Sequence, residues 1–404
     1  MIKLENISFD HCIKCTVCTI YCPVAQATHL FPGPKQSGPD AERLRIKNPE
    51  LVDASLKYCT NCKRCEIACP SDVKIAEIIQ NAKWKYVKVH WFRPRDFFMS
   101  RTDLVGGLAT IFSGLTNFII NLKIMKVLMH LFLKIPYRRT FPAYQRGTFT
   151  RLYKKKIMKS QKGYDKRAVF YHGCFVNYNN HSLGEDLIKV MNALGYGVDL
   201  VKEKCCGVPL IANGYIEKAK KNAQYNIGSL GKTGDAVIVS TSSSCSFALM
   251  HEYPSFLELD NSSYIDRLDY ITKFIYDEFT AGNIPQMKPV GIRAAYHSPC
   301  HLERMGGVIY TLGVLKMIPG LDLVVMNSEC CGIAGTYGFK SENYEISQGV
   351  GQNLFRLIEK AEPEFVVTDC ETCTMQIEMN TKYKVLHPVT LIAMALEEKN
   401  EGKR

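Results

Sequence analysis

The chain has 404 residues, of which 46% are hydrophobic, so it is long enough for two to four domains with cores of their own. It carries 17 cysteines, and its first ten residues, MIKLENISFD, contain no basic stretch with a following apolar run and no twin arginine. This composition argues against an exported, disulfide-held protein. We expect the cysteines to bind metal in a reducing cytoplasm.

The positive charge is concentrated in one part of the chain. The net charge is +12, but residues 85–167 alone hold nineteen Lys or Arg against three Asp, so the remainder is slightly acidic. A basic stretch of this kind is compatible with nucleic-acid binding. However, no helix-turn-helix, zinc-finger or RNA-binding motif accompanies it, and we expect no nucleic-acid partner.

Residues 12–70 contain one cysteine pattern twice. Both copies read C-x2-C-x2-C-x3-C-P, the bacterial pattern for holding two [4Fe–4S] clusters. The first three thiolates of a copy reach one cluster from a tight turn, and the fourth, before the proline, reaches the other cluster. Zinc and disulfides are the alternatives, but zinc motifs rarely carry the third C-x2 step and the trailing Cys-Pro. The predicted ligand sets are Cys12, Cys15, Cys18 and Cys69 for the first cluster and Cys59, Cys62, Cys65 and Cys22 for the second.

The thirty-six residues between the two motifs favour the helical type of two-cluster ferredoxin over the compact bacterial type. We therefore expect residues 1–90 to form a helical, ferredoxin-like domain. After the second motif, Ser71 or Asp72 is expected to cap a helix. The apolar face of that helix is formed by Ile75, Ile78, Ile79 and Ala82.

Residues 91–165 form the basic segment. Its uncharged part, 104–120, is interrupted by glycines and slightly short for a membrane span. The next stretch predicts a helix with Lys123, Lys126, His130 and Lys134 on one face. The other face holds Leu122, Met125, Leu128, Met129, Leu131, Phe132 and Leu133. This division is typical of a helix lying in the membrane interface, and an ordinary surface helix over the core of the cluster domain is the alternative. We predict docking, with headgroups held by Arg138, Arg139, Arg146, Arg151 and Lys154–Lys156.

From residue 166 onward, short strands alternate with helices, and each of six expected strands leads to cysteine. The strands at 168–171, 198–201 and 236–239 lead to Cys174, Cys205, Cys206 and Cys245. Those at 293–297, 323–326 and 365–367 lead to Cys300, Cys330, Cys331, Cys370 and Cys373. Corresponding cysteines are 126, 125 and 128 residues apart, which predicts duplicated α/β units over 166–290 and 291–404. When the two units are aligned at Cys245 and Cys373, Ser242 corresponds to Cys370. The first unit therefore offers four thiolates and the second offers five.

These motifs carry a family resemblance. With the strings FPGPKQSGPDAERLR, HGCFVNYN, KEKCCGVPLIANG and CCGIAGTYGFK, the chain resembles the iron–sulfur subunits of quinone-linked hydroxyacid and glycerol phosphate dehydrogenases, and also heterodisulfide reductase subunits. It is most similar to the C components of bacterial anaerobic glycerol-3-phosphate dehydrogenases. The resemblance implies an α+β multidomain fold: a helical two-[4Fe–4S] ferredoxin-like domain, a basic amphipathic helical segment, and two duplicated α/β cysteine-rich (CCG) domains.

The resemblance also implies a complex of three different subunits. The partner subunits, the A and B components, carry flavin and oxidise sn-glycerol 3-phosphate. The C component receives the electrons, docks peripherally at the cytoplasmic face of the inner membrane and delivers them to menaquinone. The chain has no dinucleotide-binding glycine motif, so we expect neither flavin nor a catalytic residue on it. The rivals are an iron–sulfur subunit of a glycolate or lactate oxidase, a heterodisulfide-reductase-like thiol/disulfide reductase, and a membrane-binding scaffold with structural clusters.

In relatives, a CCG domain with five cysteines can hold a non-cubane [4Fe–4S] cluster. The matching residues are Cys300, Cys330, Cys331, Cys370 and Cys373. The first set, Cys174, Cys205, Cys206 and Cys245, suits zinc or an ordinary cluster. We expect a redox-active second site and a structural or lesser first site. His172, His297 and His301 flank these cysteines. They are expected either to transfer protons to a quinone or donate hydrogen bonds to cluster sulfur, or simply to hold the loops in place.

Overall fold

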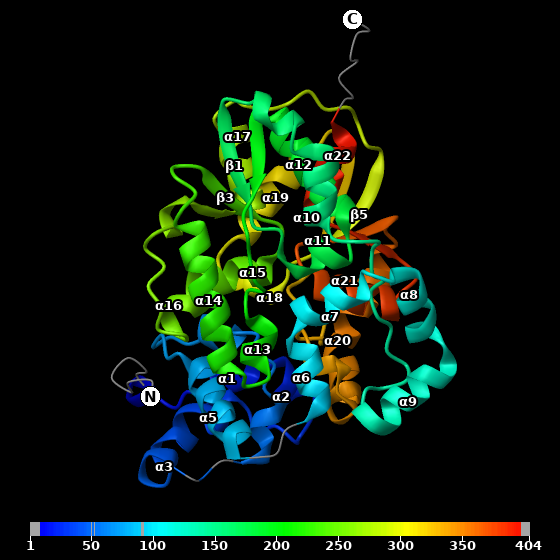
Figure 1. Ribbon diagram of the computed structural model, residues 1–404. Coiled ribbons are helices and arrows are strands. Elements are labelled where there is room, and N and C mark those ends of the chain that lie inside the picture. The colour runs from blue at the N-terminus through cyan, green and yellow to red at the C-terminus, as the bar shows by residue number, and fades with distance from the viewer. Residues whose placement is uncertain (1–8, 50, 52, 90–92, 397–404) are drawn as a thin grey trace, which may run out of the picture.

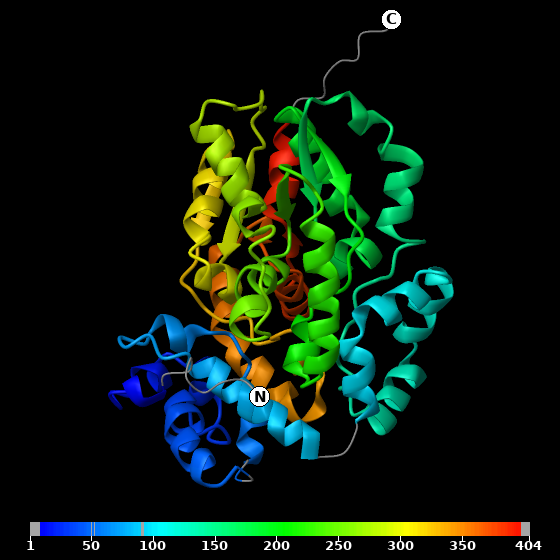
Figure 2. The same cartoon turned by 60° about the vertical axis from the view of Figure 1, so that its left-hand side comes forward.

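A computed structural model describes residues 9–49, 51, 53–89 and 93–396 (Figure 1). Most of the stretch MIKLENISFD and the predicted domain ends at residues 90, 91 and 404 lie outside the described residues. The ferredoxin-like part lies at one end of the molecule, and the two α/β units form the other end (Figures 1 and 2). The α+β multidomain fold is confirmed, whereas the domain boundaries stay a prediction.

The described residues of the ferredoxin-like part form helices and loops, with no strand among them. Its α-helices are α1 (Val17–Ile20), α2 (Pro23–Ala27), α3 (Ala41–Lys47), α4 (Arg64–Ile67) and α5 (Ile75–Val89), with shorter turns at Phe9–His11, Gln36–Asp40 and Ala54–Tyr58. The four apolar residues predicted for one face of α5 are all buried. Together with cysteines of both motifs they form one core.

The cap predicted for α5 is wrong. Glu66 Oε1 accepts hydrogen bonds from the backbone N–H groups of Ala76 and Glu77, at 3.0 and 3.3 Å. Asp72 lies in a left-handed turn with a φ of 47°, and its carboxylate binds Lys74 Nζ at 2.6 Å. A carboxylate on α4, the preceding helix, therefore accepts hydrogen bonds from free N–H groups of α5.

The basic segment consists of short helices. These are α6 (Pro94–Ser100), α7 (Thr102–Ala109), α8 (Ser113–Asn121), α9 (Lys123–Leu133) and α10 (Phe149–Leu152), followed by turns at Tyr153–Ile157 and Ser160–Gly163. In Figure 1, α8 and α9 form an arm at the edge of the molecule. No single described helix is long and apolar enough to cross a membrane, but α7 and α8 together meet that length and composition with a bend of 108° between them.

Each α/β unit contains a four-stranded parallel sheet. The first has the order β2-β1-β3-β4 and is built from β1 (Lys166–Phe170), β2 (Tyr196–Leu200), β3 (Val237–Ser240) and β4 (Leu268–Tyr270). The second has the order β6-β5-β7-β8 and is built from β5 (Ile292–His297), β6 (Leu321–Val325), β7 (Phe365–Thr368) and β8 (Lys384–Leu386). The identical strand order supports the predicted duplication. The three-residue strands β4 and β8 were not predicted.

Helices connect and cover these sheets. The first unit contains α11 (Gly173–Tyr178), α12 (His181–Ala193), α13 (Val208–Ala212), α14 (Ile216–Leu230), α15 (Ser243–Phe247), α16 (Tyr253–Ser255) and α17 (Ile271–Thr280), with turns at Ala248–Glu252 and Ile265–Arg267. The second contains α18 (Cys300–Arg304), α19 (Val308–Lys316), α20 (Ser341–Ala361), α21 (Glu371–Asn380) and α22 (Pro388–Ala395), with a turn at Tyr337–Phe339.

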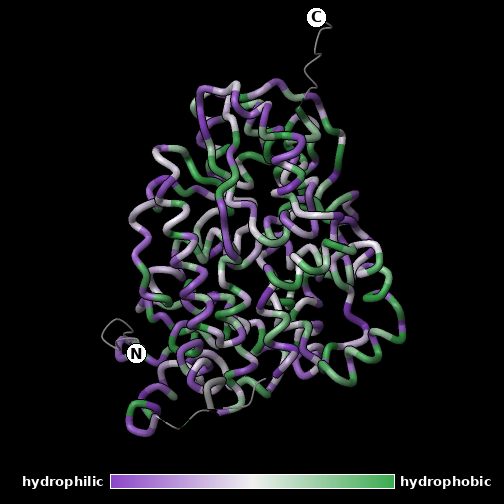
Figure 3. Tube along the Cα trace, in the orientation of Figure 1, coloured by the Kyte–Doolittle hydropathy of each residue, from purple (hydrophilic) through white to green (hydrophobic). Residues whose placement is uncertain are grey.

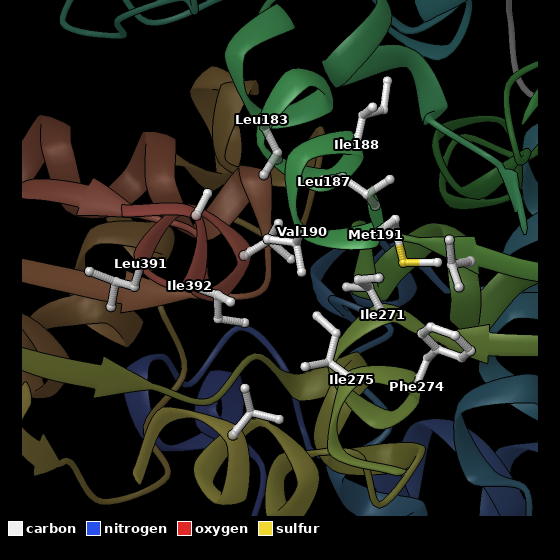
Figure 4. Close-up of a cluster of buried hydrophobic side chains, with 14 of the residues drawn as sticks. Leu183, Leu187, Ile188, Val190, Met191, Ile271, Phe274, Ile275, Leu391 and Ile392 are labelled. Atoms are coloured by element: carbon white, nitrogen blue, oxygen red, sulfur yellow. The ribbon is translucent and has the colours of Figure 1, made fainter. Parts of the chain in front are cut away.

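The two α/β units share one hydrophobic core. Side chains of α12 and α17, from the first unit, pack with side chains of α19 and α22, from the second. Figure 4 shows this meeting of Leu187 and Met191 with Ile275, Leu391 and Ile392. The two duplicated units are therefore joined through the packing of these four helices.

Candidate iron–sulfur sites

The cysteines of the ferredoxin-like part surround two separate hollows. The first ferredoxin site is a hollow lined by Cys12, Cys15, Cys18 and Cys69. The second ferredoxin site is lined by Cys22, Cys59, Cys62 and Cys65. Each hollow thus takes three cysteines from one motif and the last cysteine from the other motif.

The loops around both hollows repeat one backbone feature. Lys14 and Thr16, which flank the second cysteine of the first motif, have φ values of 61° and 65°, and Asn61 and Lys63 at the same places in the second motif have 55° and 64°. Residues other than glycine rarely adopt this left-handed conformation, and holding one there costs about 1–3 kcal/mol. Such strain is typical of loops that must bend around a bound group.

Both ferredoxin sites have the donor set for an iron–sulfur cluster. The trailing cysteines accept backbone hydrogen bonds in equivalent ways, Cys22 Sγ from Ala25 N at 3.5 Å and Cys69 Sγ from Val73 N at 3.4 Å. Burial, with the neighbouring Cys62, raises the pKa of Cys22 to about 12. Four crowded thiols of this kind become thiolates when iron supplies the opposing charge, so the residues fit the cluster.

The first CCG site gathers four cysteines at the carboxyl ends of β1, β2 and β3, the edge at which α/β sheets bind ligands. These are Cys174, Cys205, Cys206 and Cys245. Thr102, on α7 of the basic segment, donates its hydroxyl to Cys174 Sγ at 3.2 Å or Cys205 Sγ at 3.3 Å. Sulfhydryl hydrogen bonds from Cys174 and Cys206 hold the pKa of Cys205 well below its usual value.

Ser242 occupies the fifth position of the first unit, but its side chain is used elsewhere. Its Oγ accepts a hydrogen bond from the Cys245 backbone N–H at 3.2 Å and so caps α15. The same hydroxyl donates to Glu371 Oε2, in the second unit, at 3.1 Å. The first CCG site therefore has four sulfur donors, which fits tetrahedral zinc as well as a cluster.

The second CCG site brings five cysteines to the ends of β5, β6 and β7. These are Cys300, Cys330, Cys331, Cys370 and Cys373. Cys331 Sγ and Cys373 Sγ are 3.2 Å apart, and Cys330 Sγ accepts a hydrogen bond from Gly332 N at 3.4 Å. Hydrogen bonds from the Cys373 thiol and the Thr372 hydroxyl outweigh burial and lower the pKa of Cys370 to about 6. A thiol with so low a pKa is a ready metal ligand.

The three candidate histidines differ in their surroundings. A ring nitrogen of His297 lies within 4.8 Å of Cys331 Sγ and Cys373 Sγ, and the residue is 1% exposed. Within the described part of the chain, neither ring nitrogen has a hydrogen-bond partner. His172 instead contacts Glu203 and Thr150, and burial lowers its pKa to about 4. His301 contacts Ser244 and stacks on Phe247. Only His297 among the three thus presents free nitrogens to the sulfurs.

The second CCG site lies against the second ferredoxin site. Cys330 belongs to the same buried core as Cys22 and Cys65. Burial, followed by the neighbouring Cys62, raises the pKa of Cys300 well above its usual value. The sequence carries no signal for this adjacency, because it joins loops more than two hundred residues apart.

The basic segment exposes an apolar surface. On α7, α8, α9 and the turn between α7 and α8, the exposed large side chains are Leu104, Leu108, Ile111, Phe112, Leu115, Phe118, Ile124, Val127, Leu128, Leu131 and Phe132. Hydrophobic residues colour much of α8 and α9 in Figure 3. We call this set the apolar arm surface.

The predicted faces of α9 are wrong in part. Lys126 and His130 are half-buried, Met125 and Met129 are half-buried beside them, and Ile124 is exposed. The half-buried side of α9 therefore holds both basic and apolar residues, whereas Lys123 and Lys134 are exposed. At the end of the helix, the Lys134 carbonyl oxygen accepts hydrogen bonds from Arg95 and from Ser341. No residue of α9 is buried, and none belongs to the hydrophobic core of the ferredoxin-like part.

The prediction that Arg139 holds a lipid headgroup is wrong. Its side chain is 1% exposed, donates to Gln376 Oε1 at 2.6 Å and lies over the ring of Phe339. Burial lowers its pKa to about 10. The other residues of that set are exposed, and Thr148, Thr150, Arg151, Lys154 and Lys155 line an open hollow.

Comparison with known proteins identifies the family. The C component of the anaerobic glycerol-3-phosphate dehydrogenase from Escherichia coli K12 is 52% identical over 400 residues, which cover 97% of this chain and 100% of that protein. The chain belongs to this C-component family. A model of the 4Fe-4S dicluster domain matches residues 8–73, and a model of the cysteine-rich CCG domain matches 168–250 and 294–378.

More distant relatives correspond to the rival interpretations. The D component of a dihydromethanophenazine:CoB–CoM heterodisulfide reductase from Methanosarcina barkeri is 28% identical over 92% of this chain and 88% of its own length. Lactate utilization protein A of a Geobacillus species is 27% identical over 55% of this chain and 96% of its own. The C-component family is supported by about twice that identity, and the chain is an iron–sulfur subunit of the oxidoreductase class.

Proposed function

We propose that this subunit carries electrons from flavin-containing partner subunits, the A and B components, which oxidise sn-glycerol 3-phosphate, to menaquinone in the membrane. The 52% identical relative, a component of an anaerobic glycerol-3-phosphate dehydrogenase, supports this substrate. The observation that carries the electron-transfer role is the packing of the second CCG site directly against the second ferredoxin site in one core. A scaffold with structural clusters would not require this adjacency.

The proposal includes the ligand sets. Cys12, Cys15, Cys18 and Cys69 hold one [4Fe–4S] cluster, and Cys59, Cys62, Cys65 and Cys22 hold the other. The five cysteines of the second CCG site hold a non-cubane cluster, and the four of the first hold zinc or a lesser centre. When bound, the clusters supply one-electron carriers. The chain's own residues fix their places, donate hydrogen bonds to their sulfurs and set the charge around them.

Electrons are proposed to enter at the first ferredoxin site. Cys15 is exposed there, whereas Cys18 is buried. Three large apolar side chains of the same loops, Ile13, Ile20 and Tyr21, are more than half exposed. An exposed ligand surrounded by apolar side chains suits docking of a partner protein that delivers electrons.

Docking at the cytoplasmic face of the inner membrane is supported by the apolar arm surface. The side chains of Phe132 and Phe112 are 79% and 69% exposed, and many apolar neighbours on α7–α9 are exposed beside them. Groups of exposed apolar side chains of this kind mark interaction sites. The exposed Arg151, Lys154 and Lys155 are placed to attract anionic headgroups.

The test uses the chain purified anaerobically with its partner subunits. Electron paramagnetic resonance (EPR) follows cluster reduction after addition of glycerol 3-phosphate, glycolate or lactate. We expect reduction by glycerol 3-phosphate alone. Reduction by glycolate or lactate instead would assign the subunit to another oxidase, reduction only by thiols would favour a disulfide reductase, and clusters that no substrate reduces would favour a scaffold.

A further inference from the structure

Arg64 joins the ferredoxin-like part to the second CCG unit. It is the first residue of α4, and its Nη1 donates to the Ser328 carbonyl oxygen at 3.2 Å while its Nη2 donates to the Ser328 hydroxyl at 2.7 Å. Nη2 also pairs with Glu303 Oε2, on α18, at 3.3 Å. A single side chain therefore joins the second motif to a loop and a helix of the second CCG unit.

The charge of Arg64 lies between cysteines of both sites. Cys65, the next residue, and Cys62, two residues before, are ligands proposed for the second ferredoxin site. Ser328 stands two residues before Cys330, and α18 begins with Cys300. The side chain is 14% exposed. Burial opposes its charge, but Cys330, Glu303, Cys62 and Cys300 together keep the pKa of Arg64 above its usual value. Its Nε is buried and has no hydrogen-bond partner among the described residues.

We propose that Arg64 is a positioning and tuning residue shared by the second ferredoxin site and the second CCG site, where it fixes their spacing and raises the reduction potentials of both centres. This inference rests on the proposed electron-transfer function. It adds that one guanidinium couples the two centres electrostatically.

The direction follows from the sign of the charge. Reduction adds a negative charge to a centre, and a nearby buried cation stabilises the reduced form more than the oxidised form. Glu303 opposes this effect because its carboxylate pairs with the same guanidinium. The geometry thus gives two residues with opposite expected effects on the same two potentials.

The neighbouring Lys63 does not have this role. Its Nζ lies 3.8 Å from Glu66 Oε1 and 3.9 Å from Glu77 Oε1, and its side chain is 2% exposed. Glu252, of the first CCG unit, contributes a further negative charge near it. Several carboxylates therefore offset the charge of Lys63, whereas thiols of two sites surround Arg64.

The test is a reductive titration of the full-length chain, purified anaerobically, with dithionite and redox mediators under EPR detection. It needs neither substrate nor partner, so its result is independent of whether glycerol 3-phosphate is the electron source. The variants are Arg64→Gln, Arg64→Lys and Glu303→Gln. Arg304→Gln is the matched control, because Arg304 Nε also links α18 to α4, through Glu66 Oε2 at 3.7 Å.

We expect Arg64→Gln to lower the midpoint potentials of both adjacent centres and to leave the first ferredoxin site unchanged. Arg64→Lys keeps the charge and should stay near the wild-type values, Glu303→Gln should raise both potentials, and Arg304→Gln should shift neither. The proposal is overturned if Arg64→Gln shifts neither potential, if Arg64→Lys lowers them as much, or if Arg304→Gln has the same effect. If Arg64→Gln fails to retain iron, Glu303→Gln decides: a raised potential supports the proposal, and an unchanged or lowered one overturns it.

Discussion

Cys370 and Ser242 stand at corresponding positions of the two CCG units, and their side chains differ only in sulfur against oxygen. Cys370 is buried among four other cysteines, whereas the Ser242 hydroxyl caps α15 and binds Glu371. We expect Cys370→Ser to remove about four iron atoms per chain, one cluster's content. Ser242→Ala is the control and should leave the iron content unchanged. Iron, zinc and sulfide contents are measured for both variants and for the wild type. A wild-type chain with iron for only two [4Fe–4S] clusters would contradict a third redox centre.

His297 permits a second residue-scale prediction. Because its unpartnered ring nitrogens lie beside Cys331 and Cys373, we expect one of them to donate a hydrogen bond to cluster sulfur, which favours the reduced form. His297→Ala should then lower the midpoint potential of the second CCG centre in an EPR titration. His172→Ala, which removes an equally buried ring bound to Glu203, should leave that potential unchanged. Equal shifts in the two variants would count against the hydrogen bond.

The residues that could be predicted are those whose spacing is local. Four cysteines separated by two or three residues specify a cluster-binding loop on their own, and the cysteines of the CCG units follow strands that the sequence reveals. Arg64, Thr102 and the free nitrogens of His297 could not be found this way. Each acts on sulfurs from another part of the chain, and their side chains have no distinctive spacing in the sequence.

At the scale of elements, the arm of α8 and α9 yields a prediction about membrane binding. Moving a phenylalanine from water into the interface is worth about 1.5–3 kcal/mol. Replacing both Phe112 and Phe132 by serine should therefore weaken binding to anionic lipid vesicles by at least about a hundredfold, as measured by co-sedimentation. The control is Ile284→Ser, which changes an exposed apolar residue outside the arm.

The same experiment separates peripheral docking from insertion. High salt or alkaline carbonate should release the wild-type protein, because headgroup attraction by Arg151, Lys154 and Lys155 is screened. Protein that resists both treatments and leaves the membrane only in detergent would contradict peripheral docking. A double variant that still binds as tightly as Ile284→Ser would show that the apolar arm surface is not the contact.

Helices and strands could be predicted where the apolar residues of their sequence pattern are the ones buried in the core. The six longer strands lead to cysteine as expected, and α5 buries the predicted face, because both are packed on a core. The orientation of α9 was not predictable in the same way. Its amphipathic pattern shows that two faces exist, but the half-buried side holds basic residues, Lys126 and His130, together with the apolar Met125 and Met129. The pattern alone does not show that this mixed side faces the protein.

At the scale of the whole molecule, the duplication has a mechanical consequence. The sequence predicts two similar α/β units, yet it gives no sign that α12 and α17 share a core with α19 and α22. An individual unit would leave the apolar faces of its helices in water. The two CCG sites are thus held in one rigid frame, and this frame sets the second CCG site against the second ferredoxin site.

This shared core makes stability a common property of both units. Leu187 on α12 and Leu391 on α22 are fully buried in it, one from each unit. Each Leu→Ala replacement removes buried methyl groups and should cost about 2–5 kcal/mol of unfolding free energy. Because the core is common, both variants should lower the midpoint of the same cooperative transition in urea, followed by far-ultraviolet circular dichroism of the α/β part. Met394→Ala, at an exposed position of α22, should change it by less than about 0.5 kcal/mol. A chain in which Leu187→Ala and Leu391→Ala shift two separate transitions, or a fragment of residues 166–290 that folds by itself, would contradict the single frame.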